Sequence, residues 1–341
     1  MPRNNKSFNK SLGLVVALAL LFVIPSWMKN QYYLHVAITI FFTIGLAASL
    51  RFIMNTGQIS LAHAAFVGIG AYFSAVLVKK LGFSFWLAMP MAGMISAFVG
   101  ALIGYCTLRI KGVYFILVTF GLIEIFRIVF TNFWKPLFGG AMGIVGVPAP
   151  VIRLPFLNPI VFSSKVPYYY LALCLCIFSL WIMYRIEKSA IGKVFFSIKQ
   201  ADHLVEAVGV SLMKYKVMAF TIGCFFAGMI GSFFAHYYRN IFPNNFTMWY
   251  STDILVAVII GGVASFSGPI VGATILAFFS EALSAFRMYQ TLVFGLVLIF
   301  TILFVPQGFM GLYPRLTPLI KRLSARNVSR AHDVGDRGRV P

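Results

Sequence analysis

The chain has 341 residues, of which 60% are hydrophobic and only 11% are charged, with a mean hydropathy of +0.89. This composition excludes a soluble protein with one core, because the chain carries repeated apolar spans of about 20 residues, the length that crosses a bilayer. The net charge of +20 does not indicate nucleic-acid binding, because most Lys and Arg residues lie in short loops between apolar spans.

We predict an all-α, polytopic integral membrane protein with about ten membrane segments. The first has a basic start but no small-residue cleavage site after it, so we expect an uncleaved helix. Segments next to Gly57 and Gly268 are rich in glycine and alanine and are candidates for broken or re-entrant helices. The ten segments lie at about 11–27, 32–50, 59–78, 84–106, 112–133, 167–184, 217–237, 250–264, 269–284 and 289–305.

The stretch that follows Asn55 reads NTGQISLAHAAFVGIGAYFSAVL. Its small residues favour close helix packing. Packing explains its polar residues less well, and Gln58, Ser60 and His63 are therefore candidates for a translocation path. The alternative for His63 is a core histidine with satisfied hydrogen bonds.

Glu124 and Arg127 stand three residues apart in the apolar segment FGLIEIFRIVF and can pair on one helix face. Charges inside a membrane are costly and need a reason. One interpretation is a polar lining near the substrate path, and the other is a structural ion pair that faces neighbouring helices.

The segment from 134 to 166 is too long for a simple turn, and its FGGAMGIVGVP stretch has backbone able to fold back into a vestibule. A plain external loop is the alternative. Two small-residue spacings, Gly100 to Gly104 and Gly268 to Gly272, predict close helix crossings.

The longest polar interruption spans residues 185–216, and we interpret it as a cytoplasmic docking loop for a partner. Gly209 stands where a helix would end, and Glu206 projects from a segment otherwise dominated by Lys and Arg. Apolar residues recur there at the spacing of one short helix, at Ala201, Leu204, Val205, Val208 and Leu212.

Most basic residues face the cytoplasm when both termini are placed there, which is the orientation that the positive-inside rule favours. The predicted organisation is a transmembrane domain over 1–313 and a basic tail over 314–341. We expect the tail to be disordered and to contact anionic membrane lipid.

The sequence contains no phosphate-binding loop and no protease or esterase motif, so we expect no catalytic residues, no cofactor and no enzyme activity. The four cysteines lie in apolar segments without metal-ligand spacing, so we expect no metal site. Energy for transport must therefore come from a gradient or from a partner. A gradient-driven secondary transporter would favour midplane carboxylates and inverted repeats.

Several long motifs, in order over about residues 35–313, are similar to one family. They are TGQISLAHAAFVGIGAY, LRIKGVYFILVTFGLIEIFR, FGGAMGIVGVP, EAVGV, CFFAGMIGSFFAHY, IIGGVASFSGPIVGA and FGLVLIFTILFVPQGFMGL. The chain resembles the permease subunits of ABC importers for branched-chain amino acids, in the LivM-like branch. Where that family often has TGGSNGL, this chain has FGGAMGI, so Ala141 and Met142 replace polar residues.

The resemblance implies half of a translocation path in a bacterial inner membrane, driven by a separate cytoplasmic ATPase that docks around Glu206, Ala207 and Gly209. It also implies a second related permease subunit and an extracytoplasmic solute-binding protein. Related permeases serve urea or short amides, and these solutes stay open as alternatives.

Overall fold

The computed structural model describes residues 19–25, 30–110, 112–152, 160–162, 164–283, 287–304 and 308–311. Most of the predicted first segment and the whole predicted tail, 314–341, lie outside these residues. The chain divides into two compact units, residues 1–255 and 256–341, which are described separately.

The described part of the chain is helical with four very short strands, which confirms the all-α prediction. Each predicted segment from 32–50 onward contains a helix, and α2, α4, α5, α7 and α10 are long and apolar enough to span a membrane. The elements are α2 (Gln31–Met54), α3 (His63–Lys79), α4 (Phe85–Thr107), α5 (Val113–Asn132), α6 (Lys135–Phe138), η1 (Gly140–Met142), β1 (Ile144–Val145), β2 (Val151–Ile152), β3 (Ile160–Val161), α7 (Lys165–Lys188), α8 (Ala190–Gln200), α9 (Asp202–Ala207), α10 (Leu212–Tyr238), β4 (Asn240–Ile241), η2 (Pro243–Asn245), α11 (Met248–Gly261), α12 (Gly268–Ala282) and α13 (Arg287–Phe304).

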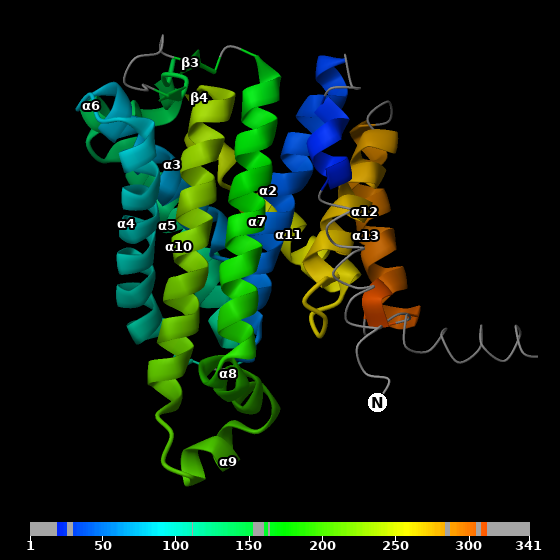
Figure 1. Cartoon of the computed structure of the whole chain (residues 1–341). Helices are drawn as coiled ribbons and strands as arrows, with labels where there is room; N and C mark the ends of the chain where they lie inside the picture. Colours follow the sequence, from blue (N-terminus) through cyan, green and yellow to red (C-terminus); the bar gives the residue numbers. More distant parts are fainter. Residues whose placement is uncertain are drawn as a thin grey trace, which may run out of the picture. The chain divides into compact units, whose positions relative to one another are not determined.

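The first unit is a helix bundle organised around α10, which packs against α4, α3 and α2, while α2 also packs against α7 (Figure 1). Small residues allow the close contacts. A Cβ atom added at Gly70 would lie 2.1 Å from the Gly228 carbonyl oxygen, so the α3 and α10 backbones touch there. A Cβ at Gly100 would lie 2.8 Å from the Cys224 Cβ, which confirms the crossing predicted from the Gly100 to Gly104 spacing.

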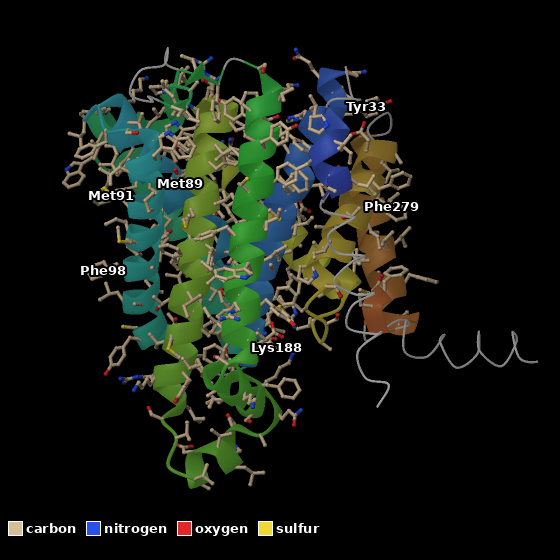
Figure 2. The ribbon with its side chains drawn as sticks, in the orientation of Figure 1. Tyr33, Met89, Met91, Phe98, Lys188 and Phe279 are labelled. Atoms are coloured by element: carbon tan, nitrogen blue, oxygen red, sulfur yellow. The ribbon has the colours of Figure 1, made fainter. Side chains whose placement is uncertain are left out.

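The outer face of α4 is apolar and exposed. Met94, Phe98, Leu102 and Tyr105 recur on it at helical spacing and are each more than half exposed. Figure 2 shows Phe98 pointing away from the bundle. In a membrane this face would contact lipid or another apolar helix.

The connection between α5 and α7 folds back onto the end of α10. Ile144 of β1 pairs with Ile241 of β4, and β2 pairs with β3 as a second antiparallel ribbon. The fold needs glycine at 143, where φ is +62° and a Cβ atom would lie 1.9 Å from the Ile241 carbonyl oxygen. Ala141 and Met142 are exposed, and the Met142 side chain is 78% exposed.

The segment between α7 and α10 lies at the end of these helices opposite the α5–α7 connection (Figure 1). The two ends are about 36 Å apart, which is the length of the 24-residue helix α7. The prediction of one helix with a continuous apolar face from Ala201 to Leu212 is wrong. Ala201 precedes α9 as its cap residue, α9 ends at Ala207, and Leu212 begins α10, so these apolar residues belong to two helices. The predicted helix end is correct, because Gly209 has a φ of +83° and follows α9 directly after its cap residue Val208.

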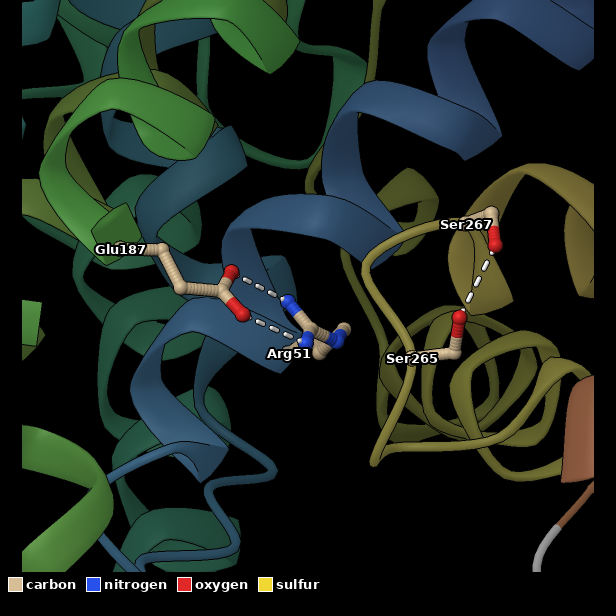
Figure 3. Close-up of polar contacts among 4 residues, drawn as sticks. All are labelled: Arg51, Glu187, Ser265 and Ser267. Carbon is tan, nitrogen blue, oxygen red and sulfur yellow. Dashed lines mark hydrogen bonds and ion pairs between the residues drawn. The ribbon is translucent and has the colours of Figure 1, made fainter. Parts of the chain in front are cut away.

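In the second unit, the end of α11 crosses the start of α12 at glycines. A Cβ atom at Gly272 would lie 1.9 Å from the Ala257 carbonyl oxygen, which confirms the crossing predicted there. The turn between the two helices includes a hydrogen bond of 2.9 Å between the Ser265 and Ser267 hydroxyl groups (Figure 3).

Candidate functional site

The connection between α2 and α3 is not helical and is mostly buried, with only Gly57 and Ile59 exposed, and side chains from other elements bind backbone groups in it and at the start of α3. Leu61 N–H donates to the Thr119 hydroxyl oxygen on α5 at 3.1 Å, and Ala64 N–H donates to the Ser251 hydroxyl oxygen on α11 at 2.8 Å. The first N–H groups of a helix lack partners within the helix, so the Ser251 hydroxyl completes the start of α3, while the Thr119 hydroxyl satisfies the connection before it. This is the arrangement that a broken helix needs inside a membrane.

Three residues predicted for the translocation path lie in or beside this connection. Gln58 is 4% exposed, and the Ser60 hydroxyl oxygen accepts a hydrogen bond from Ala62 N–H at 3.2 Å. His63 is 1% exposed, and its Nε2 lies 2.7 Å from the Ser49 hydroxyl oxygen, while its Nδ1 has no hydrogen-bond partner among the described residues. Ser60 and His63 are therefore both buried, and the hydrogen bonds of His63 are only partly satisfied among the described residues.

A buried ion pair joins α2 to the end of α7, and sequence reasoning missed it. The Arg51 guanidinium donates two hydrogen bonds to the Glu187 carboxylate, at 2.8 and 3.0 Å (Figure 3). The side chains are 4% and 26% exposed. A lone arginine in the apolar run ASLRFIMNT is the signal that could have suggested a partner.

Lys199, near the end of α8, lies within electrostatic range of this pair. Partial burial lowers the pKa of Lys199, and the Arg51 charge lowers it further, while the Glu187 carboxylate opposes both effects. The α2–α3 connection approaches α8 closely here, because a Cβ atom at Gly57 would lie 3.6 Å from the Lys199 Cα. Basic residues of α2 and α8 thus gather around the Glu187 carboxylate where the docking segment meets the bundle.

A polar cavity of about 200 Å³ opens at this meeting point. It brings predicted residue Gln58 together with the segment that was predicted to dock a partner. Its lining is Thr56, Gly57, Gln58, Gly112, Ile198, Lys199, Gln200, Asp202 and Lys216. Ser60, His63, Glu124 and Arg127 do not line it.

Glu124 and Arg127 form the predicted pair on α5, with Arg127 Nε donating to the Glu124 carboxylate at 2.7 Å. Their side chains are 38% and 36% exposed, so the described helices do not enclose the pair. At 1.5 Å per residue, Glu124 lies about 16 Å from the start of α5 and about 12 Å from its end. The pair therefore stands near the middle of a candidate membrane span, on an open face.

Glu206, Ala207 and Gly209, predicted to dock a partner, are all exposed at the end of α9. Two apolar residues beside them, Leu204 and Val208, are 71% and 77% exposed. Exposed large apolar side chains beyond the ends of the spanning helices are typical of an interaction surface.

At the other end of the bundle, His236 of α10 connects α3 to the folded-back loop. Its Nε2 lies 3.0 Å from the Ser74 hydroxyl oxygen, and its Nδ1 lies 2.7 Å from the Pro148 carbonyl oxygen. A carbonyl can only accept, so Nδ1 donates to it and Nε2 accepts from Ser74. The network fixes the loop to the bundle, and nothing in the sequence pattern indicated it.

Residues 11–302 match the sequence model of one protein family, described as branched-chain amino acid transport system / permease component. The chain is 30% identical over 333 residues to the high-affinity branched-chain amino acid transport system permease protein LivM of Salmonella typhimurium, covering 91% of this chain and 77% of the relative. Its identity to LivM of Escherichia coli is also 30%, over 94% of this chain and 79% of the relative.

A more distant relative is the autoinducer 2 import system permease protein LsrC of Escherichia coli, 25% identical over 80% of this chain and 77% of the relative. No solved structure matches the chain.

Proposed function

Since the chain belongs to the family of branched-chain amino acid transport system permease components, we propose that it forms half of the translocation path of an ATP-driven importer for branched-chain amino acids. It is a multi-pass membrane protein and a transport subunit. The family membership supports the class of solute through the two LivM relatives. Both relatives are named as permease proteins of a high-affinity branched-chain amino acid transport system.

The observation that carries the proposal is the exposed α8–α9 segment. It combines exposed apolar residues, Leu204 and Val208, with the exposed carboxylate of Glu206 beyond the ends of α7 and α10. The proposed occupant is a cytoplasmic ATPase subunit, because the chain has no phosphate-binding loop of its own. In this proposal the segment and both termini face the cytoplasm, and the loop between α5 and α7 faces outside.

The exposed ion pair on α5 favours the presence of a second permease subunit. A charged side chain at the centre of a membrane helix costs about 2.5–3.5 kcal/mol on insertion scales when lipid surrounds it. The Glu124–Arg127 pair is more than one-third exposed near the middle of α5, so a protein surface or a water-filled path should cover it. We assign this face to the contact with the related permease and to the path between the two subunits, with Gln58 nearer its cytoplasmic end.

The α5–α7 loop, held to the end of α10 by β1 and β4, is the proposed surface for an extracytoplasmic solute-binding protein. Ala141 and Met142 replace polar residues of the common family pattern and are exposed. We therefore assign no direct solute contact to them, and much of the solute choice would belong to the binding protein.

The experiment is purification of the tagged chain from its native membrane, followed by mass spectrometry of what accompanies it. The proposal predicts an ATPase, a second permease of the same family and, after crosslinking, a solute-binding protein. A chain carrying Glu206→Lys should lose the ATPase. Glu206→Gln is its matched control, because it removes the charge without reversing it. Recovery of the chain as an assembly without any ATPase would contradict the proposal, and recovery with a binding protein for urea, an amide or autoinducer 2 would reassign the solute.

A further inference from the structure

The polar cavity beside the Arg51–Glu187 pair has no role in the proposed function. Neither the docking of an ATPase on the α8–α9 segment nor the contact of α5 with a second permease uses it. Four separate parts of the first unit form its walls: the α2–α3 connection, Gly112 before α5, the α8–α9 segment and the start of α10. Its volume of about 200 Å³ equals the liquid volume of about six or seven water molecules. A small organic molecule fits a space of this size.

The chemistry of the lining includes both signs of charge. Lys199 and Lys216, whose side chains end in ammonium groups, and Asp202, whose side chain ends in a carboxylate, are among the lining residues. Lys216 is only 6% exposed, so a charged side chain is built into the wall and is not a flexible surface lysine. Gln58 and Gln200 add amide groups that can donate and accept, and Ile198 is the one apolar side chain of the lining.

This set of groups discriminates between ligand classes. An inorganic anion would pair with the lysines but would place negative charge against the Asp202 carboxylate. A simple amine would pair with Asp202 but would add positive charge beside Lys199, Lys216 and the neighbouring Arg51. A zwitterion with a carboxylate and an ammonium group satisfies both, because charge-assisted hydrogen bonds form at each end.

We propose that this cavity is a regulatory binding site for a small α-amino acid arriving from the cytoplasm, with its carboxylate toward Lys199 and Lys216 and its ammonium group toward Asp202. The inference rests on the proposed function, which places this end of the bundle in the cytoplasm and makes amino acids the accumulated product.

The position of the site gives the ligand a means of regulation. A molecule bound in the cavity contacts both Gln58 of the α2–α3 connection and Asp202 of the docking segment. It therefore stabilises the conformation in which these two segments lie as they do in this structure. In the proposed function, the ATPase drives transport by moving the docking segment relative to the bundle. Product that accumulates inside would therefore slow further import.

A protection experiment tests the site without transport. Gln200→Cys, an exposed position of the lining, and Ser197→Cys, an exposed position on α8 outside it, are made in a full-length chain whose four native cysteines are replaced. Inside-out membrane vesicles containing the chain with its partners are treated with an impermeant maleimide. L-leucine at ten times its Kd should slow alkylation of Gln200→Cys about tenfold and leave Ser197→Cys unchanged.

Ligand analogues and a charge variant complete the test. N-acetyl-L-leucine, leucine methyl ester and inorganic phosphate should give no protection at the same concentration. Adding Lys199→Gln should abolish protection of Gln200→Cys, and adding Lys193→Gln, an exposed lysine of α8 outside the cavity, should preserve it.

Equal protection by phosphate, or full protection in the presence of Lys199→Gln, would overturn the assignment. No ATP is needed, so absence of protection in an importer that takes up leucine would reject this site alone. Failure of uptake with intact protection would instead reject the proposed function.

Discussion

Removing Glu187 should destabilise the protein more than removing any exposed carboxylate of the docking segment. The Arg51 guanidinium is 4% exposed and keeps both of its carboxylate hydrogen bonds within 3.0 Å, so Glu187→Ala leaves a buried charge without that partner. Breaking one side of a buried ion pair costs about 3–5 kcal/mol. Because Glu187 is 26% exposed and water can partly replace it, we expect the lower end, about 3 kcal/mol.

The assay is thermal unfolding of the purified chain in detergent, followed by the loss of monodisperse protein. A change of about 3 kcal/mol corresponds to a decrease of about 6–12 °C in Tm. The control is Glu206→Ala, which removes an exposed carboxylate of the same segment and should change stability by less than about 0.5 kcal/mol.

The double variant Arg51→Met/Glu187→Met separates charge from packing. It leaves neither charge in the core, so it should recover most of the stability that Glu187→Ala loses. If Glu187→Ala were no less stable than Glu206→Ala, or if the double variant were as unstable as Glu187→Ala, the pair would not hold α2 against α7 as argued here.

Glu206→Lys should abolish uptake and ATPase co-purification with the fold intact, because like charges across an interface cost several kcal/mol; undiminished association with normal uptake would remove α9 from the coupling role. Arg127→Ala should lower the assembled amount of protein more than Glu124→Gln, since the first leaves a carboxylate without its partner and the second leaves a neutral amide; normal assembly of both, with lost transport, would make the pair purely functional. Single cysteines at Ser197 and Ala141, in a cysteine-free background, should react with impermeant reagents from opposite sides of the membrane, and labelling of both from outside would refute the proposed orientation.

The helices were predictable from sequence because apolar runs and glycine spacings are local signals. The crossing at Gly272 and the helix end at Gly209 were both correct for this reason. The start of a new helix at Leu212 was not predictable, because the apolar period from Ala201 to Leu212 continues across the turn at Gly209 and periodicity does not report backbone angles. The pattern alone therefore joined α9 to the start of α10.

The sequence allowed us to predict which polar residues stand out in the candidate site, but not which residues they contact. Gln58 stood out as polar in an apolar stretch, but its neighbours across the cavity come from positions such as Lys199 and Lys216, far along the chain. Arg51 and Glu187 are 136 residues apart, and the apolar run around Arg51 suggests a partner without identifying Glu187 as that partner. Such pairs arise only when α2 and α7 pack together, which a local pattern does not encode.

The most direct test of the proposed function is uptake of labelled L-leucine into liposomes that contain the chain together with its co-purified permease and ATPase, with the solute-binding protein added outside. We expect uptake that requires ATP at the ATPase, persists when ion gradients are collapsed and disappears when the ATPase subunit is omitted. Uptake by this chain without the ATPase, driven by an imposed ion gradient, would contradict it.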